Sequence, residues 1–171
     1  MNCKTFFSSF LCLLLFNFSS FCDSPKKISD GLNSLLNGPV LDSSGKEVSK
    51  DKLVGKTIGF YFSAQWCPPC RTFTPKLVDF RDANKKEFEV VFVSSDKGVK
   101  EQLEYMKETK MKWYTLPHRS VAANALAKKF EVRGIPSLVI VSANGKTITK
   151  DGRSQVSSNP KGAIKKWKES S

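Results

Sequence analysis

The stretch "YFSAQWCPPCRTF", residues 61–73, places two cysteines two residues apart behind a run of apolar residues. The overlapping run "TIGFYF" (57–62) is nearly continuously apolar and rich in β-forming residues, which is typical of a strand buried on both faces. The following "RTFTPKLVDFRDANKK" (71–86) carries apolar residues at helical spacing, with a proline that predicts a kink. The sequence therefore places Cys67 and Cys70 where a buried strand gives way to a helix.

Two cysteines at this spacing suit three kinds of chemistry: a structural disulfide, half of a metal site, or a redox pair. A disulfide across two intervening residues closes a very small loop and adds little chain-entropy stabilisation. A tetrahedral zinc site needs two more ligands, and the chain has one histidine, His118, which we assign to a loop. Redox chemistry is therefore favoured, and we expect no metal and no bound organic cofactor.

Residues 1–22 have the pattern of a signal peptide. A short basic start with Lys4 precedes the apolar run 5–18, and small residues then lead into polar sequence. The run is shorter than the roughly 20 apolar residues that span a bilayer. The alternatives are a retained membrane anchor and a lipid attached at Cys22. Cleavage after Cys22 would leave one domain, residues 23–171, with no membrane span and a secreted, periplasmic or secretory-pathway lumenal location.

The same cleavage decides the cysteine count. Of five cysteines, three lie in the expected signal peptide, and only Cys67 and Cys70 lie beyond it. A framework of structural disulfides needs several pairs at larger spacings. The count therefore supports the redox interpretation.

Length and composition indicate one globular domain, because 171 residues with 40% hydrophobic content can bury a real core. The formal net charge is +12. A basic balance of this size fits either a solvated basic face or attraction to an acidic partner. No arginine-rich tract or nucleic-acid motif is present, so we expect no nucleic-acid partner. Nothing in the sequence indicates an obligate interface, and we expect a monomer.

Downstream of the cysteines, strand and helix patterns alternate. "FEVVFVSSD" (88–96) predicts a second buried strand, followed by a helix over 99–110 with Asp96 as its cap. Three apolar residues are expected to share the buried face of that helix: Val99, Leu103 and Met106. "MKWYTLPHRS" (111–120) is a loop or short strand, and "VAANALAKKFEV" (121–132) predicts a further helix.

Two segments carry turn signals. "PVLDSSGKEVSKDKLVGK" (39–56) has Ser-Ser-Gly between apolar stretches and predicts a hairpin or extended loop, after one short helical turn within 24–38. "SLVIVSANGKTITKDG" (137–152) predicts two strands joined at Asn144-Gly145.

A last helix is predicted over 160–169, with Ile164 and Trp167 facing inward. The order of elements predicts an α/β fold, in which a central mixed sheet is flanked by helices on both faces.

The junction between strand and helix explains why the cysteines would be reactive. The free N–H groups and the dipole at a helix N-terminus favour thiolate over thiol. In Cys-X-X-Cys motifs the thiol pKa falls from about 8.5 to roughly 3.5–7.5. We therefore expect Cys67 to be the exposed nucleophile and Cys70 the buried resolving thiol. Pro68 and Pro69 suit the first helical turn, where a missing N–H costs little.

Pro136 supplies a second part of the expected site. It stands at the entrance to a predicted strand, where a proline is unusual. Either a cis Ile135–Pro136 peptide bond or a trans proline that begins the strand explains it.

Four segments carry a family resemblance: "FYFSAQWCPPCRTFTPKL" (60–77), "FEVVFVSSD" (88–96), "MKWYTLP" (111–117) and "FEVRGIPSLVIV" (130–141). Their order and approximate spacing resemble the tryparedoxin and nucleoredoxin branch of the thioredoxin superfamily, over about residues 27–167. "LDSSGKEVSKDKLVGK" (41–56) is also similar to the entry region of bacterial secreted thiol–disulfide oxidoreductases of this fold.

The resemblance implies a thioredoxin-like fold with a Cys67–Cys70 disulfide, in which Cys67 is the nucleophile and Cys70 resolves the mixed disulfide. It also implies a cis Pro136 packed against the disulfide. The backbone of Ile135 would pair with an incoming peptide or thiol substrate.

The resemblance further implies that Trp66 flanks the nucleophile and that Trp113 lies at the rim of the site, although ordinary packing would also explain either tryptophan. The chain departs from thioredoxins proper, which carry a buried Asp six residues before the nucleophile. That position here is Tyr61, as in the tryparedoxin branch. The proton of Cys70 must then pass to water or to another group, such as the Tyr61 hydroxyl, and the electron donor is open.

The predicted function is that of a thiol–disulfide oxidoreductase acting on protein or small-molecule disulfides. One alternative keeps this chemistry but makes the protein an electron donor to a peroxiredoxin, recharged by an upstream thiol reductant. A second alternative, of a different class, is a non-catalytic protein-binding module on a thioredoxin scaffold. In that case a basic face would recognise an acidic partner, and the disulfide would be a permanently oxidised relic.

Overall fold

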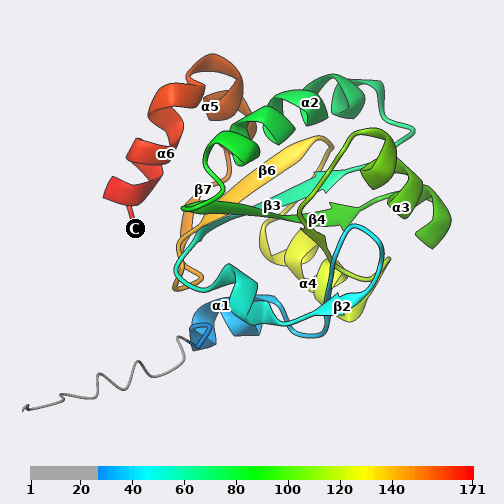
Figure 1. Cartoon of the computed structure of the whole chain (residues 1–171), viewed down its shortest axis with the longest axis horizontal. Helices are drawn as coiled ribbons and strands as arrows, with labels where there is room; N and C mark the ends of the chain where they lie inside the picture. The colour runs from blue at the N-terminus through cyan, green and yellow to red at the C-terminus, as the bar shows by residue number, and fades with distance from the viewer. Residues whose placement is uncertain (1–26) are drawn as a thin grey trace, which may run out of the picture.

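A seven-stranded mixed sheet forms the centre of the molecule (Figure 1). The computed structural model describes residues 27–171, so the expected signal peptide lies outside the described part of the chain. The strands are β1 Val40–Leu41, β2 Glu47–Val48, β3 Thr57–Ser63, β4 Phe88–Ser94, β5 Tyr114–Thr115, β6 Ser137–Val141 and β7 Thr147–Thr149. The α-helices are α1 Asp30–Leu35, α2 Pro68–Ala83, α3 Val99–Glu108, α4 Val121–Lys129, α5 Gly152–Ser158 and α6 Pro160–Glu169, and a 3-10 helix covers Lys50–Leu53.

The strand order across the sheet is β2-β1-β5-β4-β3-β6-β7. β3 pairs in parallel with β4 and antiparallel with β6, so the sheet is mixed, as predicted. All seven residues of β3 are buried, which confirms the expectation of a strand covered on both faces.

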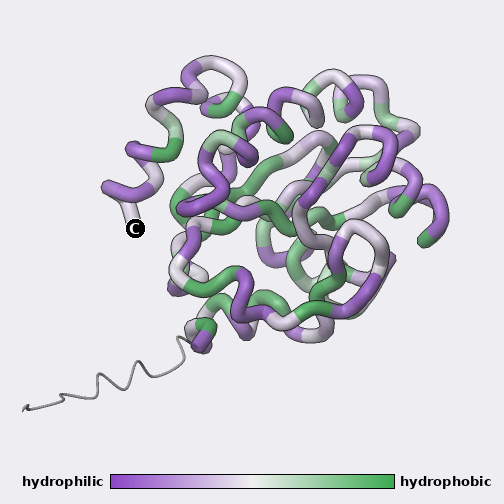
Figure 2. Tube along the Cα trace, viewed as in Figure 1, coloured by the Kyte–Doolittle hydropathy of each residue, from purple (hydrophilic) through white to green (hydrophobic). Residues whose placement is uncertain are grey.

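Helices cover both faces of the sheet (Figure 1). α1 and α4 pack on one face, against side chains such as Phe60 and Phe62 of β3. α2, α3, α5 and α6 cover the other face, where Tyr61 of β3 and Trp167 of α6 are fully buried. Figure 2 shows hydrophobic residues along the central strands and hydrophilic residues on the outer turns of the helices. The predicted α/β thioredoxin-like architecture is confirmed.

The helix after β4 differs in part from its prediction. Met106 is buried, but Val99 is 58% exposed and does not belong to the buried face. The buried face begins at Gln102 instead, because its side-chain amide donates to Thr115 Oγ1 at 2.6 Å and to the carbonyl oxygen of Leu116 at 2.9 Å. A polar residue therefore anchors this helix where an apolar one was expected.

Two elements owe their position to tertiary contacts. β5 pairs in parallel with β4 and antiparallel with β1, and so attaches the predicted β1–β2 hairpin to the sheet. α5 was not predicted, because "GRSQVSS" has one apolar residue and no periodicity. Its first residue, Gly152, lies so close to β6 that an added Cβ would come within 2.8 Å of the Leu138 carbonyl oxygen. Among residues 27–171, no helix is both long and apolar enough to cross a membrane.

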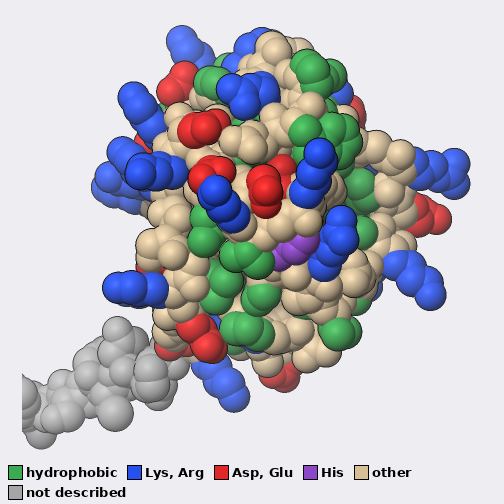
Figure 3. Space-filling model, turned by 90° about the vertical axis from the view of Figure 1, so that its right-hand side faces the viewer, with side chains coloured by type: hydrophobic (Ala, Val, Ile, Leu, Met, Phe, Trp, Pro, Cys, Tyr) green, Lys and Arg blue, Asp and Glu red, His purple; other side chains and the backbone are tan. Residues whose placement is uncertain are grey.

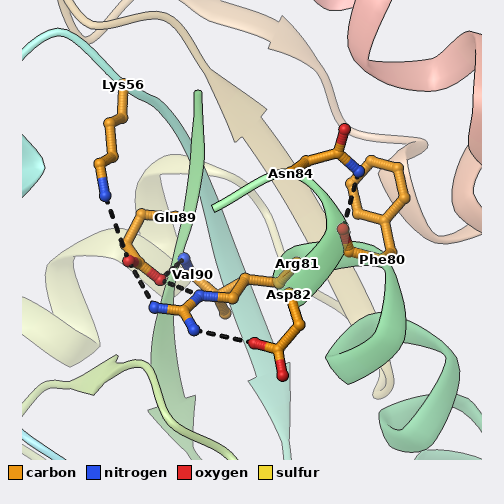
Figure 4. A network of polar contacts seen from close by, with 7 residues as sticks. All are labelled: Lys56, Phe80, Arg81, Asp82, Asn84, Glu89 and Val90. Carbon is orange, nitrogen blue, oxygen red and sulfur yellow. Dashed lines mark hydrogen bonds and ion pairs between the residues drawn. The ribbon is translucent and has the colours of Figure 1, made fainter. Parts of the chain in front are cut away.

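A network of charges lies at the start of β4 (Figure 4). Glu89 is 1% exposed, and its two carboxylate oxygens accept hydrogen bonds from Nε and Nη2 of Arg81, both at 2.7 Å. Lys56 Nζ lies 3.5 Å from Oε2 of Glu89, and the Val90 N–H donates to Oε1 at 3.0 Å. Nη1 of Arg81 also donates to Asp82 at 2.9 Å. The buried carboxylate is therefore paired and hydrogen-bonded, as a buried charge must be.

Replacing Arg81 with Met should destabilise the protein by about 3 kcal/mol, because it leaves the Glu89 charge buried without its bidentate partner. The double variant Arg81→Met/Glu89→Leu should recover most of this loss, since the charge leaves with its partner. Urea denaturation measures both. The exposed Lys165–Glu169 pair, at 3.9 Å, provides the control: Lys165→Met should change the free energy of unfolding by about 0.5 kcal/mol or less. An Arg81→Met protein as stable as the parent would mean that Lys56 alone compensates Glu89.

Candidate active site

Cys67 and Cys70 form a disulfide at the start of α2, with their Cα atoms 5.2 Å apart. Cys67 is the N-cap of α2, and its Sγ accepts the backbone N–H of Cys70 at 3.3 Å. Pro68 and Pro69 are the first two residues of the helix, as predicted from their missing N–H groups. In the reduced protein this position would stabilise a thiolate on Cys67, because free N–H groups and the positive end of the helix dipole point toward it.

The two sulfur-bearing residues differ in accessibility. Both cysteines are buried, because they pack in one cluster with Ala64 and Ile135: Cys67, which was predicted to be exposed, is only 4% exposed, and Cys70 is 0% exposed. Cys67 is the less buried of the two. On the side away from α2, Cys67 Sγ lies 3.8 Å from the carbonyl oxygen of Ile135. The Ile135–Pro136 peptide bond is cis and immediately precedes β6. The disulfide and the Ile135–Pro136 segment therefore face one another across the end of the sheet.

Trp66 lies beside this pair on the surface. Its side chain is 58% exposed, and its indole Nε1 donates to the carbonyl oxygen of Ser95 at 3.1 Å. That hydrogen bond ties the loop after β3 to the loop after β4 and limits the orientations of the ring. The result is an oriented, exposed aromatic surface next to Cys67.

Asp96 has a different role from the predicted one. α3 begins after Gly98, which makes no side-chain cap, and Asp96 is buried elsewhere. Its Oδ1 accepts the backbone N–H of Gln65 at 2.7 Å, and its Oδ2 accepts the Ser94 hydroxyl at 2.8 Å. A capping preference is a local signal, whereas here the carboxylate finds stronger partners in the neighbouring loop. Asp96 thus holds the backbone next to Trp66 and Cys67.

His118 is a loop residue, as predicted. Its Nε2 lies 2.8 Å from the backbone carbonyl oxygen of Asp96, which links the loop after β5 to the loop after β4. No acid–base partner in the described residues is hydrogen-bonded to the ring. Across residues 27–171, no group of three or more His, Cys, Asp or Glu side chains is arranged to hold a metal ion.

Trp113 is not at the rim of the site, contrary to the expectation from the resemblance. It is 1% exposed and packs in the core beneath α2 and α3, with its ring edge-on to Tyr61 at 6.4 Å. The short strand β5 follows immediately and draws this segment into the sheet. Trp113 therefore supports the site from inside, and Trp66 is the tryptophan that borders it.

Tyr61 is buried in the core beneath α2, and its hydroxyl makes no hydrogen bond to either cysteine sulfur of the disulfide. Its hydroxyl is hydrogen-bonded to Thr74 Oγ1 at 2.8 Å. Burial, and secondarily the nearby Tyr105, raises the pKa of Tyr61 far above its ordinary value. The phenol consequently stays neutral, with its hydroxyl hydrogen-bonded to Thr74. Sequence reasoning missed Thr74 and Tyr105; the only local signal was that Thr74 lies one helical turn after Cys70.

The surface around Trp66 is uneven and carries mixed charge. A hollow of about 210 Å³ is lined by Gln65, Trp66, Asp96, Lys97 and Glu101. In Figure 1, β3 and β4 run toward the face that Figure 3 presents, where acidic, basic and hydrophobic side chains are interspersed. The net charge of +12 is therefore not gathered there as one uninterrupted basic surface.

Comparison with known proteins agrees with this geometry. A thioredoxin-like family model matches residues 55–147. Tryparedoxin of Trypanosoma brucei brucei is 43% identical over 133 residues, which cover 75% of this chain and 90% of that protein. Probable nucleoredoxin 1 of Arabidopsis thaliana is 45% identical over 120 residues, which cover 68% of this chain but only 20% of the relative.

A solved structure of tryparedoxin II in complex with glutathionylspermidine superposes with a TM-score of 0.70 at 38% identity, covering 77% of this chain and 94% of that one. The chain thus spans nearly all of a tryparedoxin but about one fifth of the plant nucleoredoxin that it matches. The fold, the paired cysteines at a helix start and these relatives show that the chain belongs to the thioredoxin superfamily, in its tryparedoxin and nucleoredoxin branch.

Proposed function

We propose that the protein is a thiol–disulfide oxidoreductase that uses Cys67-Pro68-Pro69-Cys70 to reduce or exchange disulfides. The observation that carries the proposal is the position of Cys67. It is the more accessible sulfur, it caps a helix N-terminus, and it faces the Ile135 carbonyl. The helix N-terminus favours the thiolate form of Cys67, and its lower burial makes Cys67, rather than Cys70, the sulfur that an incoming disulfide meets first.

The reaction begins with the reduced dithiol. Cys67 attacks one sulfur of the substrate disulfide and forms a mixed disulfide, while the other substrate sulfur leaves as a thiolate and takes a proton. Cys70 then attacks Cys67 Sγ, which releases the second substrate thiol and forms the Cys67–Cys70 disulfide. Two electrons pass from the dithiol to the substrate. The proton of Cys70 goes to water or to the departing thiolate, because the Tyr61 hydroxyl is engaged by Thr74.

Substrate binding is assigned to three residues that border Cys67. The exposed indole of Trp66 offers apolar contact, and the Ile135 backbone at the cis Pro136 can pair with an extended segment as an added strand would. This surface is open, so it suits disulfides in proteins as well as small thiols. The glutathionylspermidine held by tryparedoxin II supports the small-thiol class.

A peroxiredoxin is the second candidate partner. The chain matches a tryparedoxin over 90% of that protein's length but a plant nucleoredoxin over only 20%. This difference favours a tryparedoxin-like role, as electron donor to a peroxiredoxin, over a nucleoredoxin-like one. The chemistry at Cys67 is unchanged, since an oxidised peroxiredoxin is a disulfide substrate. The protein would act as a monomer, with an upstream thiol reductant restoring its dithiol.

The non-catalytic binding module is the less favoured alternative. A relic would not need its less buried cysteine at a helix N-terminus, opposite the Ile135 carbonyl and beside an exposed tryptophan. All three features are present together.

For location, we propose that residues 1–22 direct the protein into a secretory pathway and are removed after Cys22. The support is the basic start and apolar run of the sequence. N-terminal sequencing of protein secreted from cells that express the full chain should begin at Asp23. Retention of residues 1–22 on membranes would instead indicate an anchor.

In an insulin-reduction assay with dithiothreitol, the protein should turn over and the Cys67→Ser variant should lose turnover completely. Cys70→Ser should retain a nucleophile but be unable to resolve, and so should accumulate mixed disulfides that a nonreducing gel separates. Equal rates for the parent and Cys67→Ser would return the cysteines to a structural role and favour the binding module.

Replacing Trp66 with Ala should lower kcat/KM for insulin about fivefold, corresponding to about 1 kcal/mol of lost contact. The thermal midpoint should change little, because the side chain is largely exposed. Val121→Ala, at a residue that is 79% exposed on α4, is the matched control and should leave the rate unchanged. Equal kcat/KM values for Trp66→Ala and the parent would remove Trp66 from the substrate-binding surface.

A further inference from the structure

Four buried hydroxyl groups form a continuous chain behind the disulfide. Tyr61 and Ser63 come from β3, Thr74 from α2 and Tyr105 from α3, and each residue is 0% exposed. Tyr61 Oη lies 2.8 Å from Thr74 Oγ1, Thr74 Oγ1 lies 2.6 Å from Tyr105 Oη, and Tyr105 Oη lies 3.3 Å from Ser63 Oγ. Thr74 therefore joins its own helix α2 to the preceding strand β3 and to the more distant helix α3.

The direction of each hydrogen bond follows from the count of protons. Thr74 has one hydroxyl proton, which it donates to the backbone carbonyl oxygen of Cys70 at 2.9 Å. Both phenols must then donate to Thr74 Oγ1, and Ser63 must donate to Tyr105 Oη. Thr74 Oγ1 thus accepts hydrogen bonds from two phenols and donates one to the Cys70 carbonyl oxygen, an arrangement in which each hydrogen bond strengthens the next.

The series of hydrogen-bonded hydroxyl groups ends at Cys70, and the N–H of this residue contacts the nucleophile Cys67. The carbonyl of Cys70 accepts the Thr74 hydroxyl, while the N–H of Cys70 donates to Cys67 Sγ at 3.3 Å. The backbone of Cys70 is therefore held on its carbonyl side by the hydroxyl network and faces the Cys67 sulfur on its amide side.

The helix needs support at this point. Pro75 follows Thr74 inside α2 and has no N–H, so the carbonyl of Arg71 loses its helical partner one turn earlier. A proline also crowds the preceding turn of its helix. The turn that carries Cys70 is thus less firmly hydrogen-bonded to the rest of α2 than an uninterrupted helix would be.

We propose that Tyr61, Thr74 and Tyr105 are positioning residues of the disulfide site, which hold the Cys70 backbone so that its N–H stays directed at the Cys67 sulfur. This inference rests on the proposed oxidoreductase function. In the reduced protein, a directed N–H stabilises the Cys67 thiolate and with it the dithiol state. Loosening the network weakens that stabilisation, so the thiol pKa of Cys67 rises and the disulfide becomes harder to reduce.

The test replaces Thr74 with Val, which keeps the shape and removes the hydroxyl, and with Ser, which restores the hydroxyl. Thr72→Val is the matched control, because Thr72 makes the same kind of bond to the Pro68 carbonyl oxygen, at 3.2 Å, on an exposed face with no phenol near it. Tyr61→Phe and Tyr105→Phe remove one donor each and keep the rings, which provides folded variants if Thr74→Val fails to fold.

Two quantities are measured in the full chain: the pH dependence of iodoacetamide alkylation at Cys67, assigned by tandem mass spectrometry, and the equilibrium of the disulfide with glutathione. Thr74→Val should raise the thiol pKa of Cys67 by about half a unit and shift the glutathione equilibrium about threefold toward the disulfide. Each Tyr→Phe variant should shift the Cys67 thiol pKa and the glutathione equilibrium in the same direction as Thr74→Val, but by a smaller amount. Thr74→Ser and Thr72→Val should match the parent in both quantities.

A lower thermal midpoint for Thr74→Val, with both quantities unchanged, would overturn the proposal and leave the network a purely structural role. An equal shift in Thr72→Val would also overturn it. Both measurements concern the cysteines themselves, so they remain decisive if the parent fails to reduce insulin. That failure would contradict the proposed oxidoreductase function and not the positioning role.

Discussion

The pairing of β3 with β6 is the constraint on which the site depends. In this antiparallel pair Phe62 lies opposite Ser137, so the end of one strand meets the start of the other. The chain leaving β3 therefore reaches Cys67 at the place where Pro136 enters β6. As a result, Cys67 Sγ lies 3.8 Å from the carbonyl oxygen of Ile135, although the two residues are 68 positions apart in the sequence. The buried side chains of both strands enforce the register that brings them together. A slip of one residue would turn these side chains to the opposite faces.

β3 also joins the two layers of the molecule to the site. Its residues alternate between the core under α1 and α4 and the core under α2, α3, α5 and α6. Tyr61 belongs to the second core, and through Thr74 it reaches the helix turn that carries Cys70. The cysteine pair at one end of the sheet is thus supported by hydrogen bonds between buried side chains in the core.

Polar groups are buried in two different ways at the two ends of the sheet. Near the start of β4, the charged Glu89 is compensated by Arg81 and Lys56. Behind the disulfide, the buried groups are neutral hydroxyls that satisfy one another. This network carries no fixed charge, and the buried carboxylate of Asp96 near the site is hydrogen-bonded to the Gln65 N–H and the Ser94 hydroxyl. The position where thioredoxins proper carry a carboxylate is occupied here by the phenol of Tyr61.

Local patterns in the sequence determined the strand before the cysteines, the helix after them, the Asn144-Gly145 hairpin and the last helix, because burial periodicity and turn chemistry act over a few residues. They also located Cys67 at a helix N-terminus, from which its chemistry follows. Only the tertiary structure decided the rest. It buried Trp113, moved Asp96 from a helix cap to the Gln65 loop, and formed α5 from a segment without apolar periodicity. It also gathered Thr74 and Tyr105 behind Cys70. Each of these depends on partners that are distant in the sequence and become neighbours only when the sheet is assembled.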